Sequence, residues 1–97
     1  MKVIALLEMN EGRRMEEMAP LQIDEAAAVW RLFKDGTVRE AYYRTDRLAA
    51  VLVLETADLA AARRAVEELP AARAGVIRVA DLIPTAPYTG FEALFQS

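Results

Sequence analysis

Apolar residues follow two patterns along the chain, short runs and stretches with a spacing of three to four. The runs predict β-strands, because each is short and is bounded by turn-forming residues. They cover residues 2–8, 37–43, 49–55 and 76–83. The stretches with helical spacing predict two helical segments. The first segment ends at Asp35, and the second spans residues 59–69. The predicted order of elements is therefore β-α-β-β-α-β.

The first helical stretch is expected in two parts, a turn near Met15 and a main helix that starts at Pro20. Pro is well tolerated at the first position of a helix, and Gly36 is suited to the position just after the end. One apolar stripe indicates the face that packs on the sheet. It consists of Ile23, Ala26, Ala27, Trp30 and Phe33.

The second helix is expected to begin after Asp58, a good N-cap residue, and to end at Pro70. Its apolar stripe is Leu59, Ala62, Val66 and Leu69. Two i,i+4 ion pairs are predicted on the other side, Arg63–Glu67 and Arg64–Glu68.

This order predicts an α+β fold of the ferredoxin-like type, a four-stranded antiparallel sheet with two helices on one face. Residues 1–84 would form the domain and residues 85–97 a C-terminal tail. The strands are apolar on both faces, most clearly at residues 49–54 and 3–7. An uncovered face with ~400 Å² of apolar area would contribute about 10 kcal/mol if buried, before the costs of association. We therefore expect a homodimer whose sheets pack face to face, or alternatively a tail that folds back over its own sheet.

Composition excludes several kinds of chemistry. The 97 residues contain no Cys and no His, which removes disulfides, thiolates and the commonest general base and metal ligand. We expect no metal and no cofactor. The net charge of −3 and the lack of a basic segment argue against nucleic acid as a partner. No apolar run is long enough for a signal peptide or a membrane span, so a cytoplasmic protein without a membrane partner is expected.

The second predicted strand carries the candidate catalytic residues, Arg39, Glu40 and Tyr43. Arg39 is suited to hold a carboxylate, Tyr43 to donate to an enolate-like oxygen, and a desolvated Glu40 to act as a base. Side chains of adjacent strand residues point to opposite faces, so Arg39 and Glu40 would share a pocket only if a bulge intervened. The alternative role for these charges is ion pairing with Glu8, Glu55 or Arg78.

Four aromatic residues are candidates for a substrate pocket between helix and sheet: Trp30, Phe33, Tyr42 and Tyr88. Aromatic residues at helical spacing also occur as ordinary core. The tail residues Phe91, Leu94 and Phe95 are too apolar to stay in solvent, so we expect the tail to pack on the partner subunit or to close a pocket.

A longer pattern adds a family resemblance. It comprises Trp30, Phe33, Gly36, the segment 38–44, Glu55, and the segments 68–70, 74–77, 83–84 and 87–90. With the element order, it resembles the dimeric α+β barrel superfamily, and within it the muconolactone isomerases. Arg39 stands at the arginine of that family's second strand, but Glu40 stands where the family has a histidine. A mechanism that depends on this histidine is therefore not available to the chain.

The resemblance implies a small cofactor-independent isomerase or cyclase that moves a proton on a hydrophobic carbonyl or lactone compound. Arg39 would orient the substrate, and Glu40 or Tyr43 would handle the proton. Two alternatives remain open: a non-catalytic dimeric module that binds a ligand or serves as an accessory, and a cofactor-free monooxygenase, which would need a wide pocket.

Overall fold

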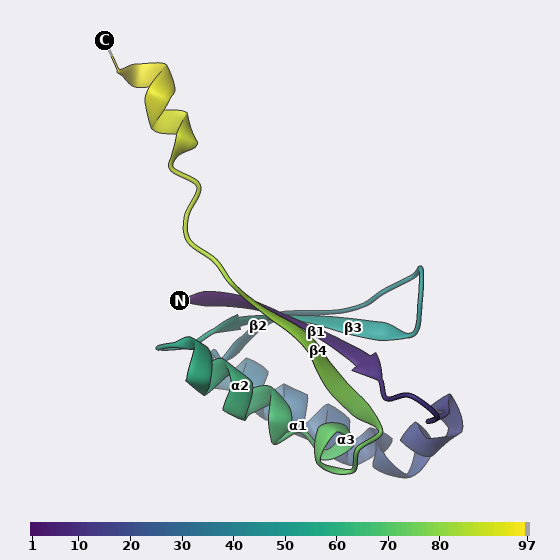
Figure 1. Cartoon of the computed structure of the whole chain (residues 1–97). Coiled ribbons are helices and arrows are strands. Elements are labelled where there is room, and N and C mark those ends of the chain that lie inside the picture. The colour runs from purple at the N-terminus through teal and green to yellow at the C-terminus, as the bar shows by residue number, and fades with distance from the viewer. Residues whose placement is uncertain (97) are drawn as a thin grey trace.

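A computed structural model describes residues 1–96 of the chain and shows the predicted order of elements, with short additional helices (Figure 1). The strands are β1 (Lys2–Met9), β2 (Val38–Tyr43), β3 (Ala49–Glu55) and β4 (Ile77–Pro84). The α-helices are α1 (Gln22–Lys34), α2 (Leu59–Glu67) and α3 (Pro70–Arg73). There are also two 3-10 helices. The first, η1 (Met15–Leu21), precedes α1, and the second, η2 (Gly90–Phe95), lies in the tail. The strand boundaries agree with the sequence prediction to within one residue.

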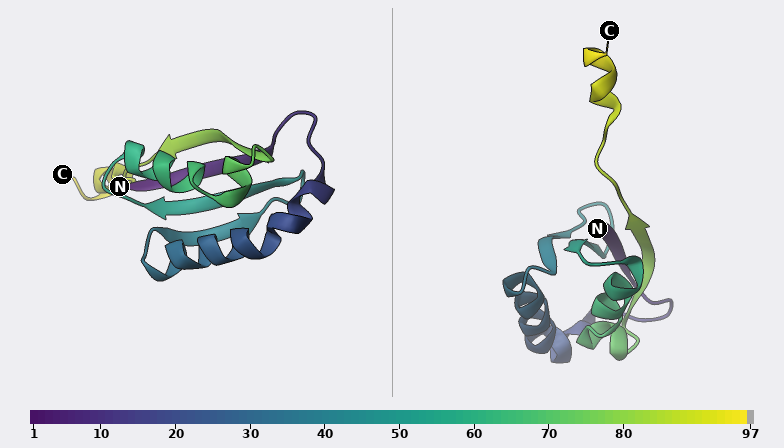
Figure 2. Two further views of the ribbon diagram at one scale, coloured as in Figure 1. Left: turned by 90° about the horizontal axis from the view of Figure 1, so that it is seen from below. Right: turned by 90° about the vertical axis from the view of Figure 1, so that its left-hand side faces the viewer.

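The strands form one antiparallel sheet in the order β2-β3-β1-β4, and the helices cover one of its faces (Figure 2). Helix α1 packs beneath β2, α2 packs on β1 and β4, and α3 contacts both helices. This arrangement confirms the predicted ferredoxin-like α+β fold. Within residues 1–96, no helix packs on the other face of the sheet.

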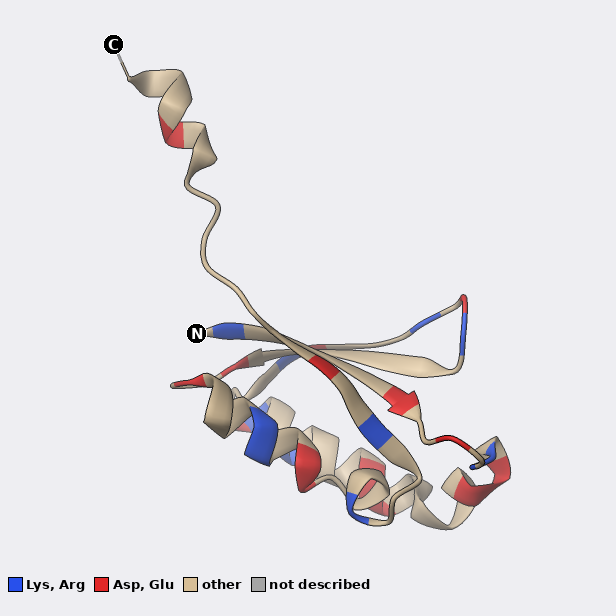
Figure 3. Ribbon diagram, viewed as in Figure 1, with Lys and Arg blue, Asp and Glu red and all other residues tan. Residues whose placement is uncertain are grey.

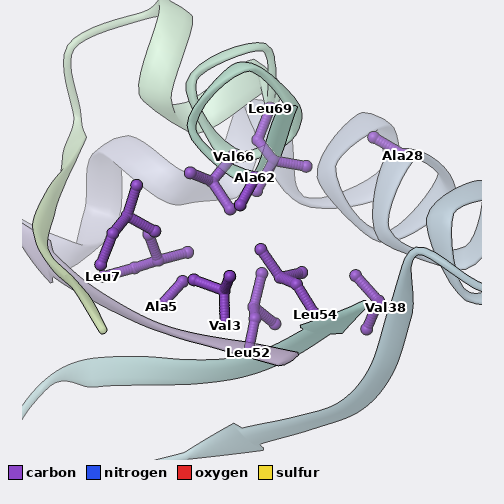
Figure 4. Close-up of a cluster of buried hydrophobic side chains, with 11 residues drawn as sticks. Val3, Ala5, Leu7, Ala28, Val38, Leu52, Leu54, Ala62, Val66 and Leu69 are labelled. Atoms are coloured by element: carbon purple, nitrogen blue, oxygen red, sulfur yellow. The ribbon is translucent and has the colours of Figure 1, made fainter. Parts of the chain in front are cut away.

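The core lies between the sheet and the helices (Figure 4). Alternate residues of β1 (Val3, Ala5 and Leu7) point into it, as the period of a strand requires. Helix α2 contributes the buried residues Ala62 and Val66. The carboxylate of Asp58 accepts a hydrogen bond of 2.7 Å from the Ala61 N–H, so the predicted N-cap is confirmed.

The predicted orientation of α1 is wrong. The side of the helix that packs inward consists of Leu21, Glu25, Ala28, Val29 and Leu32. The predicted stripe faces solvent instead, with Ile23 84% and Trp30 58% exposed. Both sides of the helix are apolar, so periodicity could not choose between them. A tertiary contact fixes the rotation, since the Glu25 carboxylate accepts a 2.9 Å hydrogen bond from the Ala71 N–H.

Two prolines occupy other places than expected. Pro20 lies inside η1 instead of starting the main helix. Pro70 does follow the end of α2, but it also opens the additional helix α3, where it occupies the first turn. Of the two predicted ion pairs on α2, Arg63–Glu67 is present at 3.2 Å. Arg64 forms no ion pair within residues 1–96.

The tail leaves the sheet directly after β4. Thr85 is hydrogen-bonded to the Lys2 carbonyl through both its N–H and its hydroxyl. Beyond Thr85 the chain projects away from the body, and η2 lies at its far end (Figure 1). The radius of gyration is 15.6 Å, compared with about 12.5 Å for a compact chain of this length. The tail therefore does not fold back over its own sheet, and Ser97 lies outside the described residues.

Candidate functional site

A bulge in β2 decides which predicted catalytic residues lie together. Val38 is paired with Leu54, but Glu40 is paired with Val53, the next residue of β3. The extra residue is Arg39. Glu40 therefore lies on the face of the sheet opposite to Val38, on the side that no helix covers. Tyr42, paired with Val51, lies on the same side.

Glu40 and Tyr42 form a hydrogen-bonded pair on this side of the sheet. The Tyr42 hydroxyl donates to the Glu40 carboxylate. This hydrogen bond, together with the negative charge, raises the pKa of Tyr42 above its ordinary value. The tyrosine thus stays protonated and remains a donor well above neutral pH.

Arg39 and Tyr43 do not join this pair. The Arg39 Nε donates to the Gly36 carbonyl at 2.7 Å, so the side chain turns back toward the end of α1. Its charge is near Glu55, whose pKa is lowered mainly by a hydrogen bond from the N-terminal ammonium and to a smaller degree by Arg39. Tyr43 is paired with Ala50, on the opposite face from Glu40, and is 86% exposed. The three predicted catalytic residues are therefore separated within one chain.

The four predicted pocket aromatics also lie apart. Trp30 and Phe33 stack on the outer side of α1, with ring centroids 5.8 Å apart. Tyr42 lies on the uncovered face of the sheet, and Tyr88 lies in the tail against Phe91. They line no common cavity between helix and sheet in the chain, because α1 is turned the other way and the tail projects outward.

The uncovered face of the sheet has an apolar centre, which we call the open face. It consists of Ile4, Leu6, Val51 and Val53, with Ile83 beside them on β4. A network of ion pairs lies at one end of the open face. The Glu8 carboxylate bridges Arg47 at 2.8 Å and Arg78 at 2.9 Å, and its side chain is only 15% exposed. The Glu40–Tyr42 pair borders the open face at β2.

A cleft of about 470 Å³ lies between α1, α2 and the ends of β3 and β2. We call it the interhelical cleft. It is lined by Leu32 of α1, by the small residues Ala57, Ala61 and Ala65, by Arg64 of α2, and by Glu68 directly after α2. Sequence reasoning missed this cleft. Its signal was the i,i+4 spacing of Ala61 and Ala65, whose small side chains leave space between α2 and α1.

Arg64 is the cation of the cleft, and Glu68, which also lines the cleft, likewise forms no ion pair within residues 1–96. The neighbouring Arg63 is engaged by Glu67, whereas the side chain of Arg64 forms no hydrogen bond or ion pair within the described part of the chain. Glu55, also in the lining, is neutralised by the N-terminal ammonium at 2.6 Å. A guanidinium beside apolar and small side chains can bind a carboxylate while the rest of a ligand rests on the apolar wall.

Residues 1–96 hold no cluster of three acidic side chains that could bind a metal ion. No helix in the same residues combines the length and apolar character that crossing a membrane requires. A scan of the sequence against protein-family models gave no match, and a search among curated proteins gave none either. The function must therefore be argued from the geometry.

Proposed function

We propose that the chain is a homodimeric binding module for a small organic acid with an apolar body, held in the interhelical cleft. The observation that carries this proposal is the unpaired Arg64 in a cleft of about 470 Å³ with an apolar wall. This volume suits a small ligand. The predicted catalytic groups, in contrast, are already bound, Arg39 to a backbone carbonyl and Glu40 to Tyr42.

The open face supports the homodimeric part of the proposal. Two rows of side chains cross all four strands, Tyr42–Val51–Leu6–Asp81 and Glu40–Val53–Ile4–Ile83. The central members are all apolar, and three of the four edge members, Tyr42, Glu40 and Asp81, carry a polar group, which is close to the usual anatomy of a protein interface. A second copy presents the same pattern, so two open faces are self-complementary in the way that a two-fold dimer requires.

Thermal shift with a panel of carboxylates tests the binding site. Benzoate, phenylacetate, octanoate and 4-hydroxybenzoate are added to the wild type, to Arg64→Gln and to Arg63→Gln. A ligand at 100 times its Kd stabilises the folded state by about 2.7 kcal/mol. We expect at least one acid to raise the Tm of the wild type and of Arg63→Gln, but not of Arg64→Gln. Binding that Arg64→Gln leaves intact, or no binding by any of the acids, would contradict the proposal.

A second candidate function rests on the Glu40–Tyr42 pair. In the proposed dimer this pair lies at the edge of the buried face, where the Glu40 carboxylate would border a ligand bound between the two sheets. Glu40 would take a proton from one carbon of a carbonyl or lactone compound and return it to another. The Tyr42 hydroxyl would donate to the enolate oxygen between the two steps. This is the isomerase function implied by the family resemblance, with Tyr42 in place of Tyr43.

Isomerisation assays on a panel of unsaturated lactones distinguish this candidate. Glu40→Gln and Tyr42→Phe are expected to lower kcat by at least about 100-fold, the usual contribution of a general base. Tyr43→Phe is the matched control, since Tyr43 lies on the other face. Equal activity of all four proteins, or no turnover by the wild type, would exclude the isomerase function and leave ligand binding as the proposed function.

A further inference from the structure

Helix α1 is apolar on two opposite sides. Its inner side packs on the core through Ala28, Val29 and Leu32. Its outer side carries the predicted stripe, which we now call the outer stripe: Ile23, Ala26, Ala27, Trp30 and Phe33. A cluster of exposed apolar side chains on a helix is typical of a surface that contacts another protein. The sheet covers the inner side of α1, and nothing within residues 1–96 covers the outer stripe.

The tail is a second apolar element without a partner. Tyr88, Phe91, Leu94 and Phe95 are between 63% and 85% exposed. Tyr88 packs edge-to-face on Phe91, with centroids 4.9 Å apart. Within the 3-10 helix η2, Phe91 and Leu94 are three residues apart and therefore lie on the same side. Glu92 is the single charged residue of the segment 85–96, and it gives the tail its one red band in Figure 3.

The two surfaces are complementary in charge, and both are apolar. Arg31 and Lys34 lie in the last turn of α1, beside the stacked rings of Trp30 and Phe33. Neither forms an ion pair within residues 1–96, so both are available to Glu92. The small residues Ala26 and Ala27 lie between Ile23 and Trp30 and allow a ring to approach the helix backbone.

The tail of a chain is too short to reach its own outer stripe. Thr85 is fixed to β1, and the five residues from there to Gly90 span at most about 17 Å. The tail starts at β4, whereas α1 lies beneath β2, three strand spacings or about 14 Å away. The outer stripe lies one further layer below the sheet, on the far side of α1. The segment from Thr85 to Gly90 is therefore too short to place η2 on the outer stripe of its own chain.

We propose that the tail of one copy docks on the outer stripe of a second copy, with Phe91 and Phe95 against Trp30 and with Glu92 beside Arg31 and Lys34. This contact is distinct from the proposed pairing of open faces. It would link chains, or dimers, into a larger assembly and bury both unpartnered apolar surfaces at once.

Cysteine cross-linking between two different chains tests the proposal, because the natural sequence contains no cysteine. A full-length Ala27→Cys chain is mixed with a full-length Leu94→Cys chain and oxidised mildly. We expect a covalent heterodimer, identified by mass spectrometry. Ala60→Cys, exposed on α2, replaces Ala27→Cys in the control and should not couple. Coupling that is equal for Ala60→Cys and Ala27→Cys would overturn the proposal. So would a double variant, Ala27→Cys with Leu94→Cys, that closes only within single chains.

A charge swap and the one tryptophan provide independent readouts. Glu92→Lys should lower the cross-linking yield at least fivefold, and adding Arg31→Glu and Lys34→Glu to the receiving chain should restore it. Trp30 is the sole tryptophan, so its fluorescence should shift to the blue as wild-type concentration rises. The shift should be lost in Phe91→Glu. A concentration-independent spectrum in the wild type, or a Glu92→Lys yield equal to that of the wild type, would refute the docking.

Discussion

At the scale of single residues, Glu25 is a carboxylate whose charged form is disfavoured by its surroundings in the folded chain. It is half-buried on the inner side of α1 and accepts a hydrogen bond from the Ala71 N–H. Loss of water raises the pKa of Glu25, and the hydrogen bond opposes this rise only in part. Glu25 joins α1 to α3 through this hydrogen bond. Because the pKa of Glu25 is raised in the folded chain, its contribution to stability depends on pH.

The sign of that dependence follows from linkage. The folded chain holds the Glu25 proton to a higher pH than the unfolded chain, whose glutamate has a pKa near 4.3. Stability from this group is therefore full below about pH 4.3 and is lost as the pH rises through the folded value. Glu25→Gln keeps an oxygen acceptor for Ala71 and does not titrate.

We expect Glu25→Gln to gain stability relative to the wild type between pH 4 and pH 7. Urea unfolding monitored by circular dichroism at both pH values measures the difference. Glu11→Gln, on the exposed turn after β1, controls for the loss of one negative charge. A difference between wild type and Glu25→Gln that is the same at both pH values would show that burial of this carboxylate does not affect folding.

At the scale of elements, α1 shows which features of a helix hydrophobic periodicity predicts and which it does not. The spacing predicted the helix and its end just before Gly36, because both depend on local geometry. It did not predict which side faces the sheet, since two apolar stripes of similar width lie on the same helix. By contrast, α2 has one stripe and charges elsewhere, and there the predicted buried residues Ala62 and Val66 were confirmed.

Neighbouring alanines on α1 provide a matched test of its rotation. Ala28 is 9% exposed and faces the core, whereas Ala27 belongs to the outer stripe. Ala28→Asp buries an unpaired charge and should cost more than about 2 kcal/mol of unfolding free energy. Ala27→Asp has the same helix propensity and should cost at most about 0.5 kcal/mol at protein concentrations low enough to prevent association. Urea titrations compare the two. A larger loss for Ala27→Asp would mean that the helix is rotated as the stripe alone predicts.

At the scale of the whole molecule, three apolar surfaces have no partner among the described residues 1–96: the open face, the outer stripe and the tail. Each is flanked by charges, the open face by Glu8, Arg47 and Arg78. Two short helices shield only one side of a four-stranded sheet, so a chain with strands apolar on both faces gains most from association.

Val51→Lys tests whether the open face forms the dimer. Val51 lies at the centre of this face, opposite Leu6 and Tyr42. A lysine there would place two ammonium groups in the buried interface, so we expect light scattering at micromolar concentration to report dissociation of the open-face pair. Ala60→Lys, exposed on α2, is the control and should keep the wild-type mass. If the wild type itself has the mass of a single 10.8 kDa chain, both proposed interfaces are absent.

The sequence by itself determined the four strands, the two main helices and their order, because turn residues, caps and apolar periodicity act over a few neighbouring positions. From the order it also determined the topology, since split β-α-β units connect in few ways. Only the tertiary structure decided the rotation of α1, the bulge at Arg39 and the cleft beside Arg64. Each of these depends on contacts between residues far apart in the chain: Glu25 with Ala71, the register of β2 on β3, and the space that the alanines of α2 leave beside α1.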